Sequence, residues 1–269
     1  MPDFRRKPKK LIAPKVLVID FRPAAVPAAW NSTDKLIQGY IDAMRELTEQ
    51  RVLFRVVEKA TVTDFPPLVD GRKYTNETWQ ETLRDDKKAL RDSHGNYMMA
   101  DYLRIVRDFN ILAKVRDRII DEVWMFGGPY FGFYESRMVG RGAFWCNAPA
   151  IEQPGRLFVM MGYNYERDVK EMVHDFGHRA ESMLCARFDS QGFLQQLYSR
   201  QALAACKNDY EEWLLEHGTV HRKPGGEDYG QDEFAWVKAL KPEWIYPAAD
   251  PNQVKGKPAP SPRGSRLAR

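Results

Sequence analysis

Hydrophobic and polar positions follow two periods along the chain, one typical of strands and one typical of helices. Short apolar runs predict buried strands, and alternation of polar and apolar residues predicts a further strand over 51–65. The buried strands are expected at 15–20 (KVLVID), 121–126 (DEVWMF) and 156–165 (RLFVMMGYNY). Helical spacing predicts a helix after the Ser32 cap and another within 166–184. Helical composition also predicts helix over 76–118, with a break at 93–96, and over 193–217, with a stop at Gly218.

Strands that alternate with helices indicate an α/β domain, with α+β as the alternative. We expect one mixed-sheet domain over 15–250, because no linker divides this part of the chain. The order of elements is too irregular to predict a doubly wound sheet. The basic segment 1–14 and the basic, proline-rich tail 251–269 are expected to be disordered.

Composition narrows the function classes. The net charge of +4 is concentrated at the two ends, so no folded basic face for specific nucleic-acid binding is expected. No apolar run approaches the roughly 18 residues of a membrane span. The start of the chain has no signal peptide, which predicts a cytoplasmic protein by default, or a secreted one if the natural start lies upstream. Three cysteines leave the disulfide state open.

The segment ERDVKEMVHDFGHRAESML (166–184) has the pattern of an amphipathic helix, with Asn164 as a candidate N-cap. Its apolar stripe is expected to face the core, and its members are Val169, Met172, Val173, Phe176, Ala180, Met183 and Leu184. His174 and His178 share the opposite face with Glu171 and Glu181. Asp175 lies on the flank of that face.

Imidazoles at positions i and i+4 can reach a single metal ion from one helix face, and nearby carboxylates can orient them or bind the ion themselves. Gly177 would let another chain or a substrate approach this helix closely. The alternative is a solvated polar face in which Glu171 pairs with His174 and Glu181 with His178.

The sequence HDFGH (174–178) resembles the HEFGH form of the His-Glu-x-x-His signature of zincin metallopeptidases. The resemblance implies that His174 and His178 are zinc ligands and that an edge strand, here 156–165, precedes the helix. Asp175 stands where that family has its catalytic Glu. Because Asp is one methylene shorter, Glu171 is an alternative catalytic base.

The third metal ligand must come from outside the motif. His221 is favoured because it lies in a Pro/Gly loop that can fold back, with Glu181 and His217 as the alternatives. In the same loop, Asp228 could orient an imidazole, and Tyr229 could steady an oxyanion.

The segment 126–147 combines glycines with aromatic residues, and it predicts either a ligand-binding wall or a layer of the core. The candidate substrate-binding residues are Tyr130, Phe131, Tyr134 and Trp145, together with Tyr229. The sequence therefore predicts a zinc-dependent hydrolase, a peptidase in the leading interpretation. The alternatives are a non-catalytic glycan- or peptide-binding module on a zincin-like scaffold, or a structural histidine face without metal.

Overall fold

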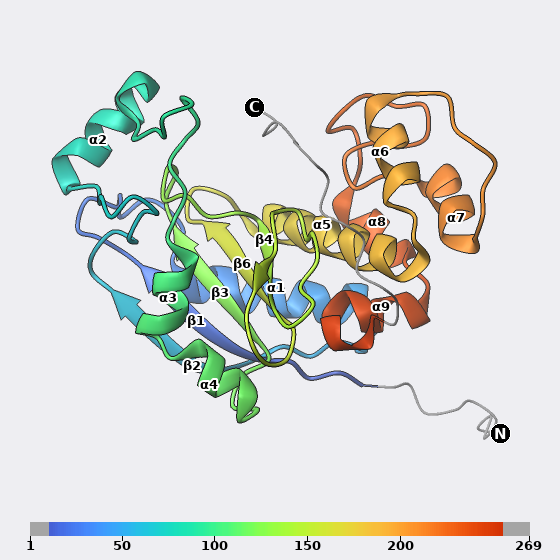
Figure 1. Ribbon diagram of the computed structural model, residues 1–269, viewed down its shortest axis with the longest axis horizontal. Helices are drawn as coiled ribbons and strands as arrows, with labels where there is room; N and C mark the ends of the chain where they lie inside the picture. The colour runs from blue at the N-terminus through green and yellow to red at the C-terminus, as the bar shows by residue number, and fades with distance from the viewer. Residues whose placement is uncertain (1–10, 255–269) are drawn as a thin grey trace.

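The computed structural model describes residues 11–254, and their centre is a six-stranded mixed sheet of order β2-β1-β3-β6-β4-β5 (Figure 1). The α/β class predicted from the sequence is confirmed. The strands are β1 (Lys15–Phe21), β2 (Arg55–Val62), β3 (Glu122–Gly127), β4 (Ser136–Gly140), β5 (Ile151–Glu152) and β6 (Phe158–Asn164).

Strands β2, β1, β3 and β6 run parallel, β4 is antiparallel to β6, and β5 is parallel to β4. Strands β1 and β3 are buried almost throughout, as expected for parallel strands that are covered on both faces. Strand β6 lies between β3 and β4, so the expectation of an edge strand before the histidine helix is wrong. Strand β4 covers the edge that β6 would otherwise expose.

Helices cover both faces of the sheet (Figure 1). Helices α1 (Thr33–Leu47) and α5 (Val169–Phe188) share a hydrophobic cluster with one face. Helices α2 (Asn76–Arg84), α3 (Tyr102–Asp108) and α4 (Ile111–Arg116) share another with the opposite face, and a short 3-10 turn, Asp86–Lys88, follows α2. The parallel part is therefore doubly wound, which the order of predicted elements did not reveal.

The C-terminal third of the described chain surrounds α5. Helices α6 (Gln191–Ser199) and α7 (Asp209–His217) replace the continuous helical segment expected over 193–217. Helices α8 (Glu233–Ala239) and α9 (Pro242–Ala249) pack against α5, and a 3-10 turn, Pro251–Gln253, follows. The covering of α5 by these elements decides the environment of the histidines.

Two local expectations need correction. Helix α5 begins at Val169, and its N-cap is Asp168, whose side chain accepts a hydrogen bond from the Lys170 N–H; Asn164 is the last residue of β6. The glycine- and aromatic-rich segment 126–147 also contains strand β4. Long-range pairing with β6 stabilises this strand, and the local pattern does not indicate it.

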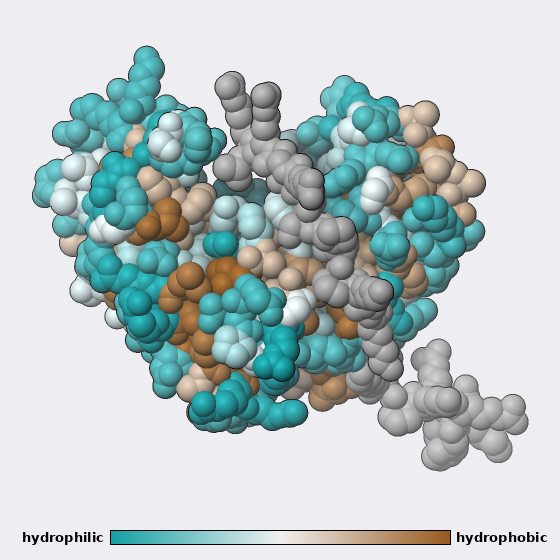
Figure 2. Space-filling view, viewed as in Figure 1, coloured by the Kyte–Doolittle hydropathy of each residue, from teal (hydrophilic) through white to brown (hydrophobic). Residues whose placement is uncertain are grey.

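The segments expected to be disordered, 1–14 and 251–269, lie outside the described part except for residues 11–14 and 251–254. Ile12 already pairs with Val52, and the Asn252 side chain donates to the Leu157 carbonyl, so both ends of the described part belong to the fold. All three cysteines are free thiols. No helix within 11–254 is long and apolar enough to cross a membrane. Hydrophilic residues cover most of the face seen in Figure 2.

Candidate metal centre

Helix α5 carries the two histidines and is buried on nearly every side. Its apolar stripe packs into the core as predicted. The opposite face is also covered: the exposed fractions of His174 and Glu181 are only 5% and 2%. Helix α8 and the segment 218–231 lie over it. A solvated polar face is therefore the wrong interpretation of this pattern.

Three imidazoles meet on this covered face. His221 arrives from the loop after α7, and its Nε2 lies 3.0 Å from Nε2 of His178. The ring centroid of His174 is 4.7 Å from that of His178 and 5.0 Å from that of His221. One nitrogen from each ring lies within 4.8 Å of the others, so the three side chains can contact one metal ion. His221, the predicted third ligand, therefore lies close enough to share one metal ion with His174 and His178.

The lack of a side chain at Gly177 makes this meeting possible. A Cβ atom there would overlap the Cγ2 methyl of Val220, the neighbour of His221, and would lie 3.2 Å from the Val220 Cβ. The close approach at Gly177 is therefore made by a loop of the same chain, and not by another chain or a substrate as expected. The loop is further fixed by the Val220 N–H, which donates to Glu181 Oε1 at 2.8 Å.

Each imidazole has a carboxylate beside its Nδ1 atom. The distances are 3.5 Å from His174 to Glu233 Oε1, 3.4 Å from His178 to Glu181 Oε2, and 3.3 Å from His221 to Asp228 Oδ1. Carboxylates in this position orient metal-ligating histidines and fix their tautomer. Glu181, an alternative third ligand in the sequence analysis, thus lies behind His178 and orients it.

His217, the other alternative ligand, lies outside the cluster. Its ring stacks on Trp213 with centroids 4.5 Å apart, and its Nδ1 lies 3.1 Å from the Trp213 carbonyl oxygen. His217 therefore contacts a residue four positions earlier in its own helix, α7, and does not contribute to the histidine cluster.

Burial and neighbouring charges shift the pKa values of the three histidines in different directions. Burial and the charge of His178 lower the pKa of both His174 and His221 below 6.5. Burial also disfavours a charged His178, but the hydrogen bond to Glu181 and the charge of Glu135 outweigh it and raise its pKa. At neutral pH, His174 and His221 are therefore neutral and can bind a metal ion.

Glu135, just before β4, is a further carboxylate at the cluster. Its Oε2 lies 3.7 Å from His178 Nε2, the nitrogen that faces the other rings, and it accepts a hydrogen bond from the Asn147 side chain. In the sequence, Glu135 is one charged residue within the glycine- and aromatic-rich segment 126–147. Its pairing with the histidines arises because β4 lies beside β6, and no local signal predicts that neighbour.

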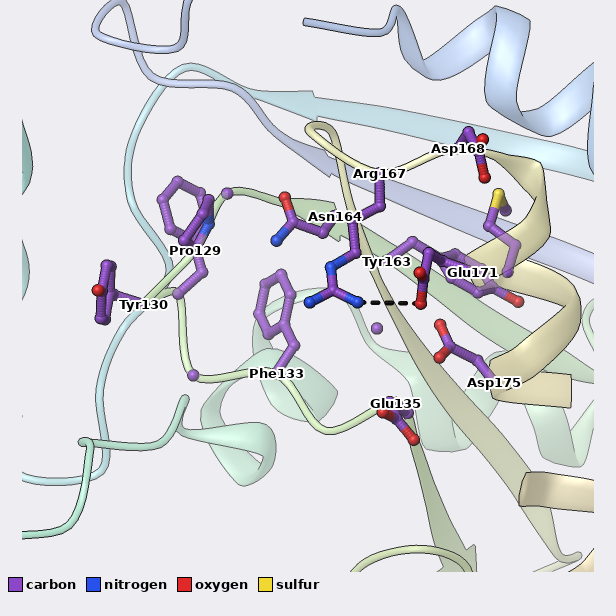
Figure 3. A pocket seen from close by; sticks show the side chains of 15 residues that line it. Pro129, Tyr130, Phe133, Glu135, Tyr163, Asn164, Arg167, Asp168, Glu171 and Asp175 are labelled. Carbon is purple, nitrogen blue, oxygen red and sulfur yellow. Dashed lines mark hydrogen bonds and ion pairs between the residues drawn. The ribbon is translucent and has the colours of Figure 1, made fainter. Parts of the chain in front are cut away.

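Asp175 and Glu171, the two expected base candidates, line a cavity of about 240 Å³ beside the cluster, and Glu135 lines it too (Figure 3). Glu171 pairs with Arg167, Oε2 to Nη1 at 2.9 Å, and not with His174. Burial raises the pKa of Asp175 well above 3.8, and the charges of Glu135 and Glu171 raise it further.

The aromatic candidates separate into two groups. Tyr130 and Phe131 line the same cavity, whereas Tyr134 and Trp145 are not among its lining residues. Tyr229 is 71% exposed and lies against the cluster, with its ring centroid 4.4 Å from that of His221. The glycine-rich segment is therefore partly core and partly cavity wall, and both interpretations of it apply.

Comparisons with protein-family models, with curated proteins and with solved structures found no match for this chain. The likeness to zincins therefore rests on the five residues of HDFGH.

Proposed function

We propose that this chain is a metal-dependent hydrolase in which His174, His178 and His221 hold Zn²⁺. The observation that carries the proposal is the 3.0 Å separation of the Nε2 atoms of His178 and His221. Each of these rings has a carboxylate beside its Nδ1, and this position favours the neutral tautomer with its proton on Nδ1 and a lone pair on Nε2. Two lone pairs at this distance repel each other unless a proton or a metal ion lies between them.

The ligand set favours zinc among the divalent metals. Three imidazoles with a fourth position open to solvent or substrate are typical of catalytic zinc, and no thiol or extended carboxylate cage lies in the cluster, which is made of three histidines within the described chain. Zn²⁺ in such a site supplies a water molecule whose pKa is lowered to about 7.

Glu135 is our proposed general base. Its carboxylate lies 3.7 Å from the metal-facing nitrogen of His178, whereas Glu171 is held by Arg167. Asp175, the residue that the zincin resemblance implies, is the second candidate because it lines the adjoining cavity. The Tyr229 phenol, beside His221, is available to donate a hydrogen bond to a developing oxyanion.

Peptide bonds are the proposed substrate, and this part rests on the resemblance of HDFGH to the zincin signature. A binding module with the same ion is the competing function. It predicts bound zinc without hydrolysis of any member of a mixed peptide library, so the two functions give different results in one assay.

Metal binding is tested by elemental analysis of the purified chain beside the double variant His174→Ala, His178→Ala. We expect one zinc per parent chain and none in the double variant. The matched control is His94→Ala, which removes an exposed imidazole outside the cluster and should keep its zinc. A parent that contains no zinc and takes up none when it is added would refute the proposal.

The base is tested by Glu135→Gln and Asp175→Asn, measured as peptide hydrolysis at equal zinc content. An amide cannot accept the proton, so loss of the base should cost about 10²–10⁴-fold in rate. We expect this loss in Glu135→Gln. The same loss in Asp175→Asn, with Glu135→Gln active, would transfer the role to Asp175.

A further inference from the structure

The cavity beside the histidines lies where α/β sheets bind their ligands. It is formed by the segment that follows β3, by the last residues of β6 and the segment after them, and by the first two turns of α5. It therefore lies at the carboxyl ends of two parallel strands. Glu135 belongs both to this cavity and to the histidine cluster. The volume of about 240 Å³ suits one amino-acid side chain or a small molecule.

Negative charge dominates the cavity wall. Four carboxylates line it, those of Glu135, Asp168, Glu171 and Asp175, against one guanidinium, that of Arg167. Figure 3 shows the guanidinium bound to Glu171. Asp168 is engaged in capping α5, where it accepts from the Lys170 N–H at 2.8 Å.

Asp175 is the carboxylate that lacks a partner. Its exposed fraction is 7%, and it makes no hydrogen bond or ion pair within residues 11–254. In Figure 3 the carboxylate points into the cavity, next to that of Glu171. The residue is buried, but its carboxylate oxygens face the cavity and receive no donor from the described chain, so a ligand that brings donors to this point is favoured over one that does not.

We propose that the cavity binds the ammonium group of an amine-bearing substrate, with Asp175 and Glu171 as its acceptors. This inference rests on the proposed hydrolase function, because the substrate would extend from here past Glu135 to the histidines. An ammonium group supplies the hydrogen-bond donors that Asp175 lacks. It also supplies positive charge, of which the cavity wall has only the guanidinium of Arg167. Tyr130 and Phe133 add aromatic side chains to the wall that can contact a cation.

The ligand preference is tested on the parent chain by calorimetry, which needs no variant. Nα-acetyl-lysinamide and Nα-acetyl-norleucinamide have similar side chains and differ in the terminal ammonium. We expect the lysine compound to bind at least about tenfold more tightly. Equal binding, or binding of neither, would overturn the proposal. Tighter binding of glucose than of the lysine compound would also overturn it, because hydroxyl donors would then be sufficient.

Variants locate the site. Glu171→Gln and Asp175→Asn should each weaken binding of the lysine compound, and the matched control Glu166→Gln should not. Glu166 is an exposed acid next to Arg167, and it is not among the lining residues. If Glu166→Gln weakens binding as much as the cavity variants do, general surface charge explains the preference and the assignment fails.

His221→Ala separates this inference from the proposed function, because His221 does not line the cavity. Loss of zinc with retained lysine-compound binding supports the cavity as an independent cation site. A parent that binds no zinc but prefers the lysine compound would refute the hydrolase and keep the ammonium site. A parent that binds zinc but does not prefer the lysine compound would refute the ammonium site and leave the proposed hydrolase function standing.

Discussion

Gly177→Ala tests how the histidine cluster is assembled. Gly177 lies inside α5, where alanine normally favours the helix by about 1 kcal/mol over glycine. The new methyl, however, would overlap the Val220 Cγ2 atom and lie 3.2 Å from the Val220 Cβ. Val220 is fully buried and is stiff at χ1, so the loop itself must move.

The opposing contributions set the expected magnitude. Overpacking in a close-packed interior costs about 1–3 kcal/mol. Displacing the loop also weakens the Val220 N–H bond to Glu181, worth about 1 kcal/mol. After the gain of about 1 kcal/mol in helix propensity, we expect a net loss of about 1–3 kcal/mol in the free energy of unfolding. Because His221 follows Val220, zinc affinity should fall by at least about tenfold.

The assay combines chemical denaturation of the metal-free chain with a competitive zinc titration. Gly192→Ala is the matched control: Gly192 lies in α6, and a Cβ there meets no atom within 4 Å. That variant should be unchanged or stabilised by at most about 1 kcal/mol, with unaltered zinc affinity. If Gly177→Ala behaves like Gly192→Ala, the close approach of the loop does not constrain the site and the reasoning is refuted.

Three further variants probe buried charge. Glu181→Gln should weaken zinc binding about 10–100-fold in a competition titration, because it loosens the orientation of His178; an unchanged affinity would contradict this. Burial, and then the charge of Glu135, raise the pKa of Asp175 above 3.8, so the folded state binds that proton more tightly than the unfolded state. The stabilisation that this proton gives the folded state is present below about pH 4 and is lost as the pH rises. Asp175→Asn should therefore be more stable than the parent at pH 8 but not at pH 4. Glu122→Gln should cost about 3–5 kcal/mol in urea denaturation, because it leaves the buried guanidinium of Arg179 without its ion pair at 2.8 Å; a loss below 1 kcal/mol would show that water reaches this pair.

The sequence by itself determined the elements whose signal is local. The apolar runs at 15–20, 121–126 and 156–165 each became a strand, and Ser32 caps α1 as its position before the amphipathic segment predicts. The pairing of His174 with His178 follows from helical geometry, since residues four apart face the same side.

Only the tertiary structure decided which distant segments meet. His221 lies 43 residues after His178, and its approach depends on the small size of Gly177 and on the path of the loop after α7. Strand β4 forms by pairing with β6, and the same pairing brings Glu135 to the cluster. Pairing between segments leaves no periodic pattern in either one alone.

The environment of the histidine face also required the fold. A polar helix face with Glu171 and Glu181 has the same pattern whether water or protein covers it. Here α8 and the loop of His221 cover it, so Glu181 is buried against a ring while Glu171 pairs with Arg167 at the cavity. The sequence specifies which side chains share a face, and packing against other elements decides whether those side chains are solvated or form a site.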